Sequence, residues 1–326
     1  MVMRIQEDIS LASYTVIKIG GPARYFCDVT DANELEAAVR FAAEKELLFF
    51  VLGAGSNVLI SDNGFPGLVI HLRNDAIKIE GETAYAGAGV MMPRLAMVTV
   101  QVGLTGFEWG TGIPGTVGGS IRGNAGCFGG EVRDNVESVM VFDTKKVTRL
   151  AQAPAERASF KLQATSCGFG YRESIFKKRP EWIIVDATFK LKKINPATAQ
   201  NIFRKIQKKS KERVEEQPIG EKTMGSTFKG VTASDDIIAF LRRANIAWQK
   251  GVNRRGFLSA GFLIEYAGLK GCRIGGAEVS SRHANFIINT GTATASDVVE
   301  LVTRIKDTVK DKFGISLEEE IQYLGF

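Results

Sequence analysis

Histidine and cysteine are scarce in this sequence, which has two histidines and four cysteines among 326 residues. The cysteines stand at positions 27, 127, 167 and 272, so no two of them form a Cys-x-x-Cys pair. Zinc sites are usually built from closely spaced cysteines and histidines. We therefore expect no metal site, and we expect reduced thiols that are mostly buried.

Long apolar runs are also missing. The most apolar stretch covers residues 47–52, whereas a membrane-spanning helix needs about 20 apolar residues. The first eight residues lack the apolar core of a secretory signal peptide. We expect a soluble, cytoplasmic protein without a membrane partner.

Proline is rare and glycine is common, with 8 prolines against 35 glycines. Disordered segments usually combine proline with charge, so the glycines indicate tight backbone positions in folded structure. The 44% share of hydrophobic residues and the chain length suit two or three domains, each with its own core.

The net charge is +6, and basic residues cluster at 205–213 and at Arg254–Arg255. Such a cluster can attract nucleic acid or an anionic substrate. No nucleic-acid-binding motif accompanies it, so a solvated helix face is the better interpretation. We expect no nucleic-acid partner.

Apolar periodicity divides the chain into three parts. A helix and strands open it, and Asp31 with Glu34 indicates the first helix start. Short strands follow, then a basic helix that Asn195–Pro196 opens and that runs to about residue 214. The last part holds helices and short strands. We predict an α+β fold of three lobes, at residues 1–75, 76–213 and 214–317, with a final strand at 318–326 returning to the first lobe.

Individual elements follow from the same periodicity. We expect Ser296 to cap the last helix and Gly314 to end it. Further helices are predicted at 92–102, 154–159, 234–246, 259–267 and 296–313. Strands are predicted at 47–52, 58–60, 68–72, 84–88, 136–142, 147–150, 182–191, 272–274, 286–289 and 321–324.

A glycine loop at residues 53–57, Gly-Ala-Gly-Ser-Asn, carries the first two glycines of a dinucleotide fingerprint. Its third glycine is missing and a strand follows instead of a helix, so a Rossmann nicotinamide site is disfavoured. Taken alone, the loop is equally well explained as a bare turn.

A second glycine-rich run covers residues 110–130. So many glycines would be costly in backbone entropy if they served only as turns. The run suits a chain wrapped closely around a large, flat, phosphate-bearing ligand. The alternative is a buried loop packed against its own domain.

Together these segments resemble a known family. Ile19–Ala23, Gly53–Asn57, Gly112–Gly119 and Asn124–Gly126 are similar, in order and spacing, to the flavin-binding signatures of the UDP-N-acetylenolpyruvoylglucosamine reductases. The resemblance implies that two N-terminal lobes form a vanillyl-alcohol-oxidase-type (PCMH) module that clasps FAD, followed by an α+β substrate domain. It implies these cofactor-binding residues: Gly53, Ala54, Gly55, Ser56, Asn57, Gly112, Ile113, Pro114, Gly115, Thr116, Gly118, Gly119, Asn124 and Gly126.

Three further segments resemble the family's catalytic motifs. They are Phe169–Phe176, Gly225–Lys229 and Leu317–Ile321. By resemblance, the catalytic residues are Arg172, Ser226 and Glu320, and Tyr171 and Lys229 contact the substrate.

The implied reaction reduces the enolpyruvyl group of UDP-N-acetylglucosamine enolpyruvate to give UDP-N-acetylmuramate, a peptidoglycan precursor, with FAD and NADPH. Arg172 would pair with the substrate carboxylate as negative charge develops there. Ser226 would protonate the α-carbon, and Glu320 would polarise the substrate near the same carbon. The hydride chemistry belongs to the flavin.

Each catalytic residue also has a plainer interpretation. Arg172 can pair with Glu173, and Ser226 can cap a turn after a glycine. The three adjacent glutamates can form the exposed, acidic beginning of a strand. Glu319 stands where the family usually has proline, so the motif leaves an ambiguity between Glu319 and Glu320.

The resemblance weakens after Lys229. Family members commonly continue with asparagine or arginine and then proline, whereas this chain has Gly230–Val231 and an insertion at about 231–257. The segment after Phe176 lacks a tyrosine-bearing loop, which is typical of the family's shorter subtype. We expect a monomer. The alternatives are an FAD oxidoreductase of the same fold acting on another substrate, or a noncatalytic nucleotide-binding module.

Overall fold

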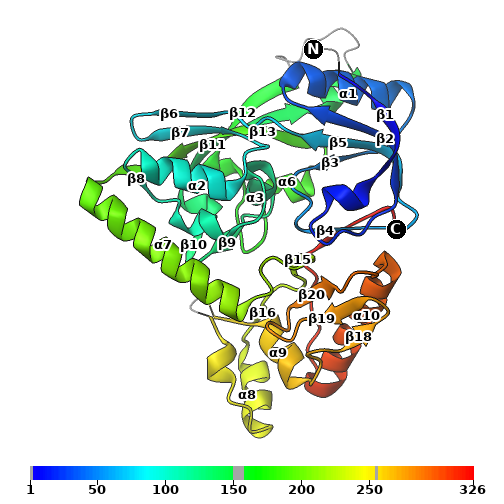
Figure 1. Cartoon of the computed structure of the whole chain (residues 1–326), viewed down its shortest axis with the longest axis vertical. Helices are drawn as coiled ribbons and strands as arrows, with labels where there is room; N and C mark the ends of the chain where they lie inside the picture. Colours follow the sequence, from blue (N-terminus) through cyan, green and yellow to red (C-terminus); the bar gives the residue numbers. More distant parts are fainter. Residues whose placement is uncertain (1–2, 150–157, 254–255) are drawn as a thin grey trace. The chain divides into compact units, whose positions relative to one another are not determined.

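The computed structural model describes residues 3–149, 158–253 and 256–326 (Figure 1). Contacts between residues divide the chain into two compact units. The first unit comprises Met1–Ile9, Pro22–Gly55 and Phe65–Lys211, and the second comprises Ser10–Gly21, Ser56–Gly64 and Glu212–Phe326. Among the described residues, no helix combines the length and the apolarity that a membrane crossing requires.

The first unit contains a four-stranded sheet in the order β1-β2-β5-β3. Its strands are β1 (Gln6–Ser10), β2 (Pro22–Val29), β5 (Phe65–Leu72) and β3 (Phe49–Leu52). β5 pairs in parallel with both β2 and β3. Helix α1 (Ala32–Glu44) buries Leu35, Ala38, Val39 and Ala42 against this sheet (Figure 1). The spacing of these residues gives the helix one apolar face.

The predicted start of α1 is confirmed. Asp31 accepts hydrogen bonds from the backbone N–H groups of Asn33 and Glu34, which are among the donors that a helix start leaves unpaired. The Glu34 carboxylate turns back to the backbone N–H and the hydroxyl of Thr30.

A second, five-stranded antiparallel sheet in the first unit has the order β12-β11-β13-β7-β6. Its core is separate from that of the first sheet and includes the helices α2 and α3. The elements are β6 (Ile77–Glu80), β7 (Thr83–Gly87), α2 (Met92–Gln101), α3 (Val117–Arg122), β11 (Val136–Asp143), β12 (Ser159–Gln163) and β13 (Trp182–Lys190).

Short elements connect these strands, and the long basic helix follows them. Every described residue of that helix is at least partly exposed, which agrees with a solvated face. The connecting elements are β8 (Leu104–Thr105), η2 (Glu108–Gly112), β9 (Gly126–Cys127), β10 (Gly130–Glu131), η3 (Val132–Asp134), α4 (Thr144–Arg149), η4 (Ala164–Ser166), α6 (Ile175–Lys178), β14 (Lys192–Lys193) and the basic helix α7 (Pro196–Glu216).

The second unit is built around an antiparallel sheet in the order β15-β20-β19-β18. Helices α9 and α10 cover it, and α10 contributes seven buried residues to the core. The elements are η1 (Leu11–Tyr14), β15 (Thr223–Ser226), α9 (Ala260–Tyr266), β18 (Arg273–Ile274), β19 (Ala277–Val279), β20 (Phe286–Asn289) and α10 (Ala295–Phe313). A separate parallel pair joins β4 (Val58–Ile60) to β21 (Gln322–Leu324).

The insertion is a folded part of the second unit. Strands β16 (Val231–Thr232) and β17 (Phe257–Leu258) pair at its base. Between them lie α8 (Asp235–Arg243) and η5 (Trp248–Gly251). Gly251 packs on Phe262 of α9 so closely that an added Cβ would lie 2.6 Å from the ring. The predicted pair Arg254–Arg255 lies outside the described residues.

The α+β class predicted from the sequence is confirmed, but two local predictions are wrong. The strand predicted at 147–150 is wrong, since 144–149 form α4, which packs on α1, and residue 150 lies outside the described residues. Ser296 does not cap α10. Thr294 accepts from the N–H of Asp297, whose carboxylate accepts from the N–H of Thr294, so these two form the capping box.

Two further outcomes concern strands and a predicted helix. Strands β2 and β12 were not predicted from the sequence. Of the helix predicted at 154–159, residues 154–157 lie outside the described residues, and Ser159 begins β12. Gly314 ends α10 as expected, with φ at +68°.

Candidate active site

The two glycine loops of the first unit touch each other. A Cβ added at Gly53 would lie 2.6 Å from Oγ1 of Thr116, so only glycine fits this approach. Thr116 precedes α3 and its hydroxyl accepts from the N–H of Gly119, at 3.4 Å. The start of the first predicted cofactor loop therefore lies against the second loop.

A buried hydroxyl without a partner lies immediately after the second loop. Ser120 is 3% exposed, and its Oγ has no hydrogen-bond partner among the described residues. Buried polar atoms are nearly always satisfied, so an unsatisfied one beside a glycine-rich loop indicates a place for a polar ligand. Together with the close approach of the two loops, Ser120 fits the binding of FAD, which carries both phosphates and a polar ring.

Asn124 connects the glycine-rich run to the predicted arginine segment. This buried residue has a φ of +41°. Its amide nitrogen donates to the carbonyl of Gly170 at 2.8 Å, and its amide oxygen accepts from the N–H of Arg133 at 3.1 Å. Both sides of the Asn124 amide are therefore used to hold the backbone.

Arg172 lies next to the predicted cofactor residues. Its two terminal nitrogens reach the carbonyl of Gly126 at 3.4 and 3.5 Å. The neighbouring Ser174 hydroxyl donates to the carbonyl of Arg122 at 2.7 Å. The guanidinium also lies over the ring of Tyr171, 5.8 Å from its centroid. The structure therefore brings Arg172, Tyr171, Asn124 and Gly126 together.

The backbone at Arg172 is strained, with a φ of +57°. Residues other than glycine adopt this region at a cost, and such strain clusters at functional sites. The Arg172 carbonyl accepts from Nζ of Lys177 at 2.5 Å, and the same Nζ lies 3.5 Å from the Glu173 carboxylate. Glu173 thus has Lys177 as an ion-pair partner, which weakens the plainer interpretation of Arg172 as a simple partner of Glu173.

In the second unit, the predicted serine segment runs antiparallel to the predicted glutamate segment. The N–H of Glu320 donates to the carbonyl of Thr227 at 2.8 Å, and the N–H of Lys229 donates to the carbonyl of Glu318 at 2.8 Å. Phe228 and Glu319 form the bridge between these bonds. The segments that carry Ser226 and Glu320 are therefore side by side although they are far apart in sequence.

The three adjacent glutamates have different surroundings. Glu318 binds Nζ of Lys229 at 2.5 Å, and Glu319 binds Nζ of Lys306 on α10 at 2.7 Å. Successive side chains of an extended strand point to opposite faces, so Glu320 points away from the face on which Glu319 meets α10. This arrangement favours Glu320 over Glu319 as the carboxylate of the site.

Asn57 ties the first glycine loop to the glutamate segment. Its amide donates to the carbonyl of Glu320 at 3.0 Å, and its own carbonyl accepts from the N–H of Gln322 at 3.0 Å. The second unit contains Asn57, together with Ser56, Ser226, Lys229 and Glu320. Residues 53–55 and Arg172 belong to the first unit. The predicted site residues are thus distributed over both units.

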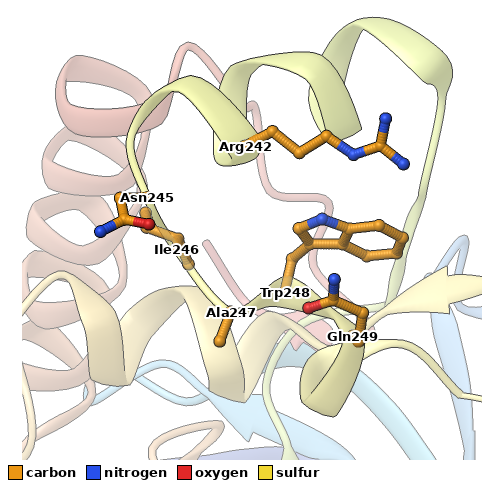
Figure 2. A pocket seen from close by; sticks show the side chains of 6 residues that line it. All are labelled: Arg242, Asn245, Ile246, Ala247, Trp248 and Gln249. Carbon is orange, nitrogen blue, oxygen red and sulfur yellow. The ribbon is translucent and has the colours of Figure 1, made fainter.

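A surface pocket occurs in the insertion, and none of the predicted site residues lines it. It is lined by Arg242, Asn245, Ile246, Ala247, Trp248 and Gln249 (Figure 2). Arg242 extends over the indole of Trp248, with 5.8 Å between the guanidinium carbon and the ring centroid. This pocket contributes nothing to the predicted site.

Sequence reasoning did not single out two residues of the predicted segments, Ser120 and Thr227, that the structure makes candidates for the site. Both are hydroxyl residues inside motifs already recognised, and both hydroxyls are buried without a partner among the described residues. Hydroxyl residues within the motifs were therefore the available signal, but burial and hydrogen bonding become known only from the structure.

Comparison with known proteins agrees with this geometry. Residues 23–147 match a family model described as an FAD binding domain. Residues 217–324 match the model of the C-terminal domain of UDP-N-acetylenolpyruvoylglucosamine reductase. The FAD-binding module predicted from the sequence is thereby confirmed.

Relatives with this name match almost the whole chain. The protein from Carboxydothermus hydrogenoformans is 37% identical, covering 98% of this chain and 94% of its own. The protein from Solibacter usitatus is 35% identical, covering 99% and 97%. The crystal structure of UDP-N-acetylenolpyruvylglucosamine reductase from Thermus caldophilus has a TM-score of 0.74 at 32% identity and covers 99% of both chains. The chain therefore belongs to the UDP-N-acetylenolpyruvoylglucosamine reductase family.

Proposed function

We propose that this chain reduces UDP-N-acetylglucosamine enolpyruvate to UDP-N-acetylmuramate, with FAD as cofactor and NADPH as reductant. The observation that carries the proposal is the antiparallel pairing of the serine segment with the glutamate segment. This pairing brings the segments that carry Ser226 and Glu320 side by side. The membership of the family supports the same reaction.

FAD fits the glycine loops of the first unit. Gly53, Thr116, Gly119, Ser120, Asn124 and Gly126 would hold it. The chemistry that FAD supplies when bound is two-electron transfer from NADPH to the enolpyruvyl double bond. The tight backbone approach at Gly53 and the buried hydroxyl of Ser120 are the features of this chain that support the assignment.

Arg172 would bind the carboxylate of the enolpyruvyl group. The planar guanidinium can form two parallel hydrogen bonds to a carboxylate. As the double bond is reduced at its β-carbon, negative charge builds on the α-carbon and spreads to that carboxylate. Arg172 then stabilises the charge more strongly than it stabilised the substrate, which lowers the barrier.

Ser226 would donate the proton that completes the reaction at the α-carbon. A serine hydroxyl is a weak acid, so the developing negative charge on the substrate must drive this transfer. Glu320 would polarise the substrate beside the same carbon, and Lys229 would bind the diphosphate. The ion pair with Glu318 restrains the Lys229 side chain.

NADPH and nucleotide sugars are both made inside the cell, so we include a cytoplasmic location in the proposal. A monomer remains a prediction from the sequence. Either can be wrong without affecting the proposed reaction.

The test is NADPH oxidation by flavin-loaded protein, followed by absorbance. We expect oxidation to accelerate when UDP-N-acetylglucosamine enolpyruvate is added, with one NADPH consumed for each UDP-N-acetylmuramate formed. UDP-N-acetylglucosamine is the matched control, because it lacks only the enolpyruvyl group. Equal rates with both compounds would contradict the proposed substrate. Turnover of an alcohol or a sugar lactone instead would favour the alternative oxidoreductase.

A further inference from the structure

Thr227 carries a buried hydroxyl that the proposed mechanism does not use. The residue is 1% exposed, and its Oγ1 has no hydrogen-bond partner among the described residues. Leaving a buried hydroxyl unsatisfied costs stability. Valine has the same shape without this cost, so the threonine calls for an explanation.

The backbone around this hydroxyl is firmly held. The N–H of Thr227 donates to the carbonyl of Asn285 at 2.8 Å. The side chain of Asn285 binds both the N–H and the carbonyl of Phe228, at 3.0 and 2.9 Å. Only rotation of the side chain about its Cα–Cβ bond can therefore redirect the Thr227 hydroxyl.

Strand geometry places this hydroxyl on the same face as the Glu320 side chain. Phe228 and Glu319 are bridge partners, so Thr227 lies opposite Glu320. Side chains that lie opposite each other on antiparallel strands share a face and are close enough to interact. The next pair on that face confirms this geometry, because Lys229 and Glu318 also lie opposite each other and form an ion pair.

We propose that Thr227 is a positioning residue whose hydroxyl donates a hydrogen bond to the Glu320 carboxylate in the flavin-loaded enzyme. Rotation of the Thr227 side chain, or of the carboxylate, completes the contact without any backbone movement. A carboxylate can accept several hydrogen bonds at once, so the contact is compatible with its other interactions. The hydroxyl then orients Glu320 towards the substrate.

This inference rests on the proposed function, because Glu320 is the group through which Thr227 acts. It also explains why the chain keeps a buried hydroxyl at this position. Sites that work by preorganisation often retain groups that reduce stability.

The experiment compares Thr227→Val and Thr227→Ser with the wild-type flavin-loaded protein. In the flavin-free protein, we expect Thr227→Val to keep or raise Tm, because it removes a buried hydroxyl that has no partner there. Its kcat with the enolpyruvyl substrate should fall about tenfold, the effect of one hydrogen bond to a charged group. The rate at which NADPH reduces the flavin should be unchanged. Thr227→Ser should restore most of the loss in kcat.

Thr99→Val is the matched control for the loss of a buried hydroxyl. Thr99 is fully buried on α2, and its hydroxyl donates to the carbonyl of Ala96 at 2.9 Å. This control should lower Tm and leave kcat unchanged. It therefore separates a loss of stability from a loss of positioning.

A double-mutant cycle with Glu320→Gln decides whether Thr227 acts through Glu320. We expect Thr227→Val to cause no further loss of kcat in the Glu320→Gln background, and we expect their effects on Tm to be non-additive. A tenfold loss in both backgrounds, or wild-type kcat in Thr227→Val, would overturn the proposal. If the wild-type protein does not turn over the substrate, the proposed function is wrong. Additive effects on Tm would then overturn the Thr227 proposal separately.

Discussion

Ser226 lies where a short strand ends. It is half-buried at the end of β15 and follows Gly225, which has a φ of +78°. A Cβ added at Gly225 would have no atom within 4 Å, so the backbone there faces open space. In the proposed reaction, Ser226 donates the proton to the α-carbon.

Replacing Ser226 with alanine should separate the two halves of the reaction. Reduction of the flavin by NADPH should continue at the wild-type rate, because no proton from Ser226 enters that step. Formation of UDP-N-acetylmuramate should fall by about 10²–10⁴, the usual contribution of a general acid. Stopped-flow absorbance measures the first step, and analysis of the product measures the second. Full turnover by this variant would remove Ser226 from the mechanism.

At the residue scale, the sequence motifs predicted which side chains belong to the site but not the backbone conformation at each of them. The motif around Arg172 predicted a functional arginine. The motif could not predict the positive φ of Arg172. This strained backbone is held by contacts that Asn124 and Lys177 make to the segment. In the same way, the choice between Glu319 and Glu320 required Lys306, which comes from a different element.

At the scale of elements, helix α10 shows how a capping interaction combines local and distant residues. Thr294 and Asp297 satisfy each other's backbone N–H groups. Asp62, from a distant part of the chain, adds hydrogen bonds to the N–H groups of Ala295 and Ser296, at 2.7 and 3.0 Å. A negative charge at this end also interacts favourably with the helix dipole. Four backbone N–H donors at the helix start are thus satisfied.

Thr294→Ala should lower the free energy of unfolding by about 1 kcal/mol, because it removes the side-chain cap. Ser296→Ala is the matched control. Its hydroxyl makes only an exposed contact to Asp62, at 3.1 Å, so we expect a loss of a few tenths of a kcal/mol, in the range of surface substitutions. Urea unfolding measures both. A loss in Ser296→Ala as large as that in Thr294→Ala would contradict the assignment of the cap.

The sequence predicted long apolar strands and amphipathic helices well and short elements less well. β20 was predicted with its observed limits, and α2 was predicted to within one residue. Strand β2 begins with proline, and the exposed Arg24 and half-buried Tyr25 lie between its buried residues. Its apolar pattern is therefore weak. Residues 147–149 include β-branched side chains but form part of α4, because Val147 is buried against the core that contains α1. Tertiary packing overrides local propensity at such places.

At the scale of the whole molecule, the second unit includes segments from three parts of the chain. Residues 10–21 and 56–64 belong to it with the C-terminal part. Backbone hydrogen bonds hold them there, including Gly21 N–H to Ser61 O and Ser61 N–H to Leu324 O, both at 2.9 Å. Periodicity along the sequence carries no information about such pairings. They depend on which backbone groups remain unpaired after the local elements have formed.

The second unit also contains His283, whose neutral ring is part of its structure. Its Nδ1 accepts from the N–H of Asn285 at 3.2 Å, and its ring packs on Phe286 with 5.0 Å between centroids. Burial lowers the pKa of His283 from its usual range, and the positive charge of Lys270 lowers the pKa further, against smaller opposing effects of Glu265 and Glu216. Protonation would also break the hydrogen bond to Asn285. Asn285 also binds the backbone of Thr227 and Phe228. The hydrogen bond between His283 and Asn285 therefore helps to hold the serine segment.

His283 should therefore make the folded protein sensitive to acid. Between its lowered pKa in the folded state and its ordinary value of about 6.5 in the unfolded state, the unfolded chain binds more protons. The contribution of the neutral ring to stability is present above about pH 6.5 and is lost as the pH falls below that value. His283→Gln removes the titrating group, so its free energy of unfolding should decline less between pH 7.5 and 5 than that of the wild-type protein. Urea unfolding at several pH values measures the difference, and parallel pH dependences of the two proteins would show that His283 does not couple folding to pH.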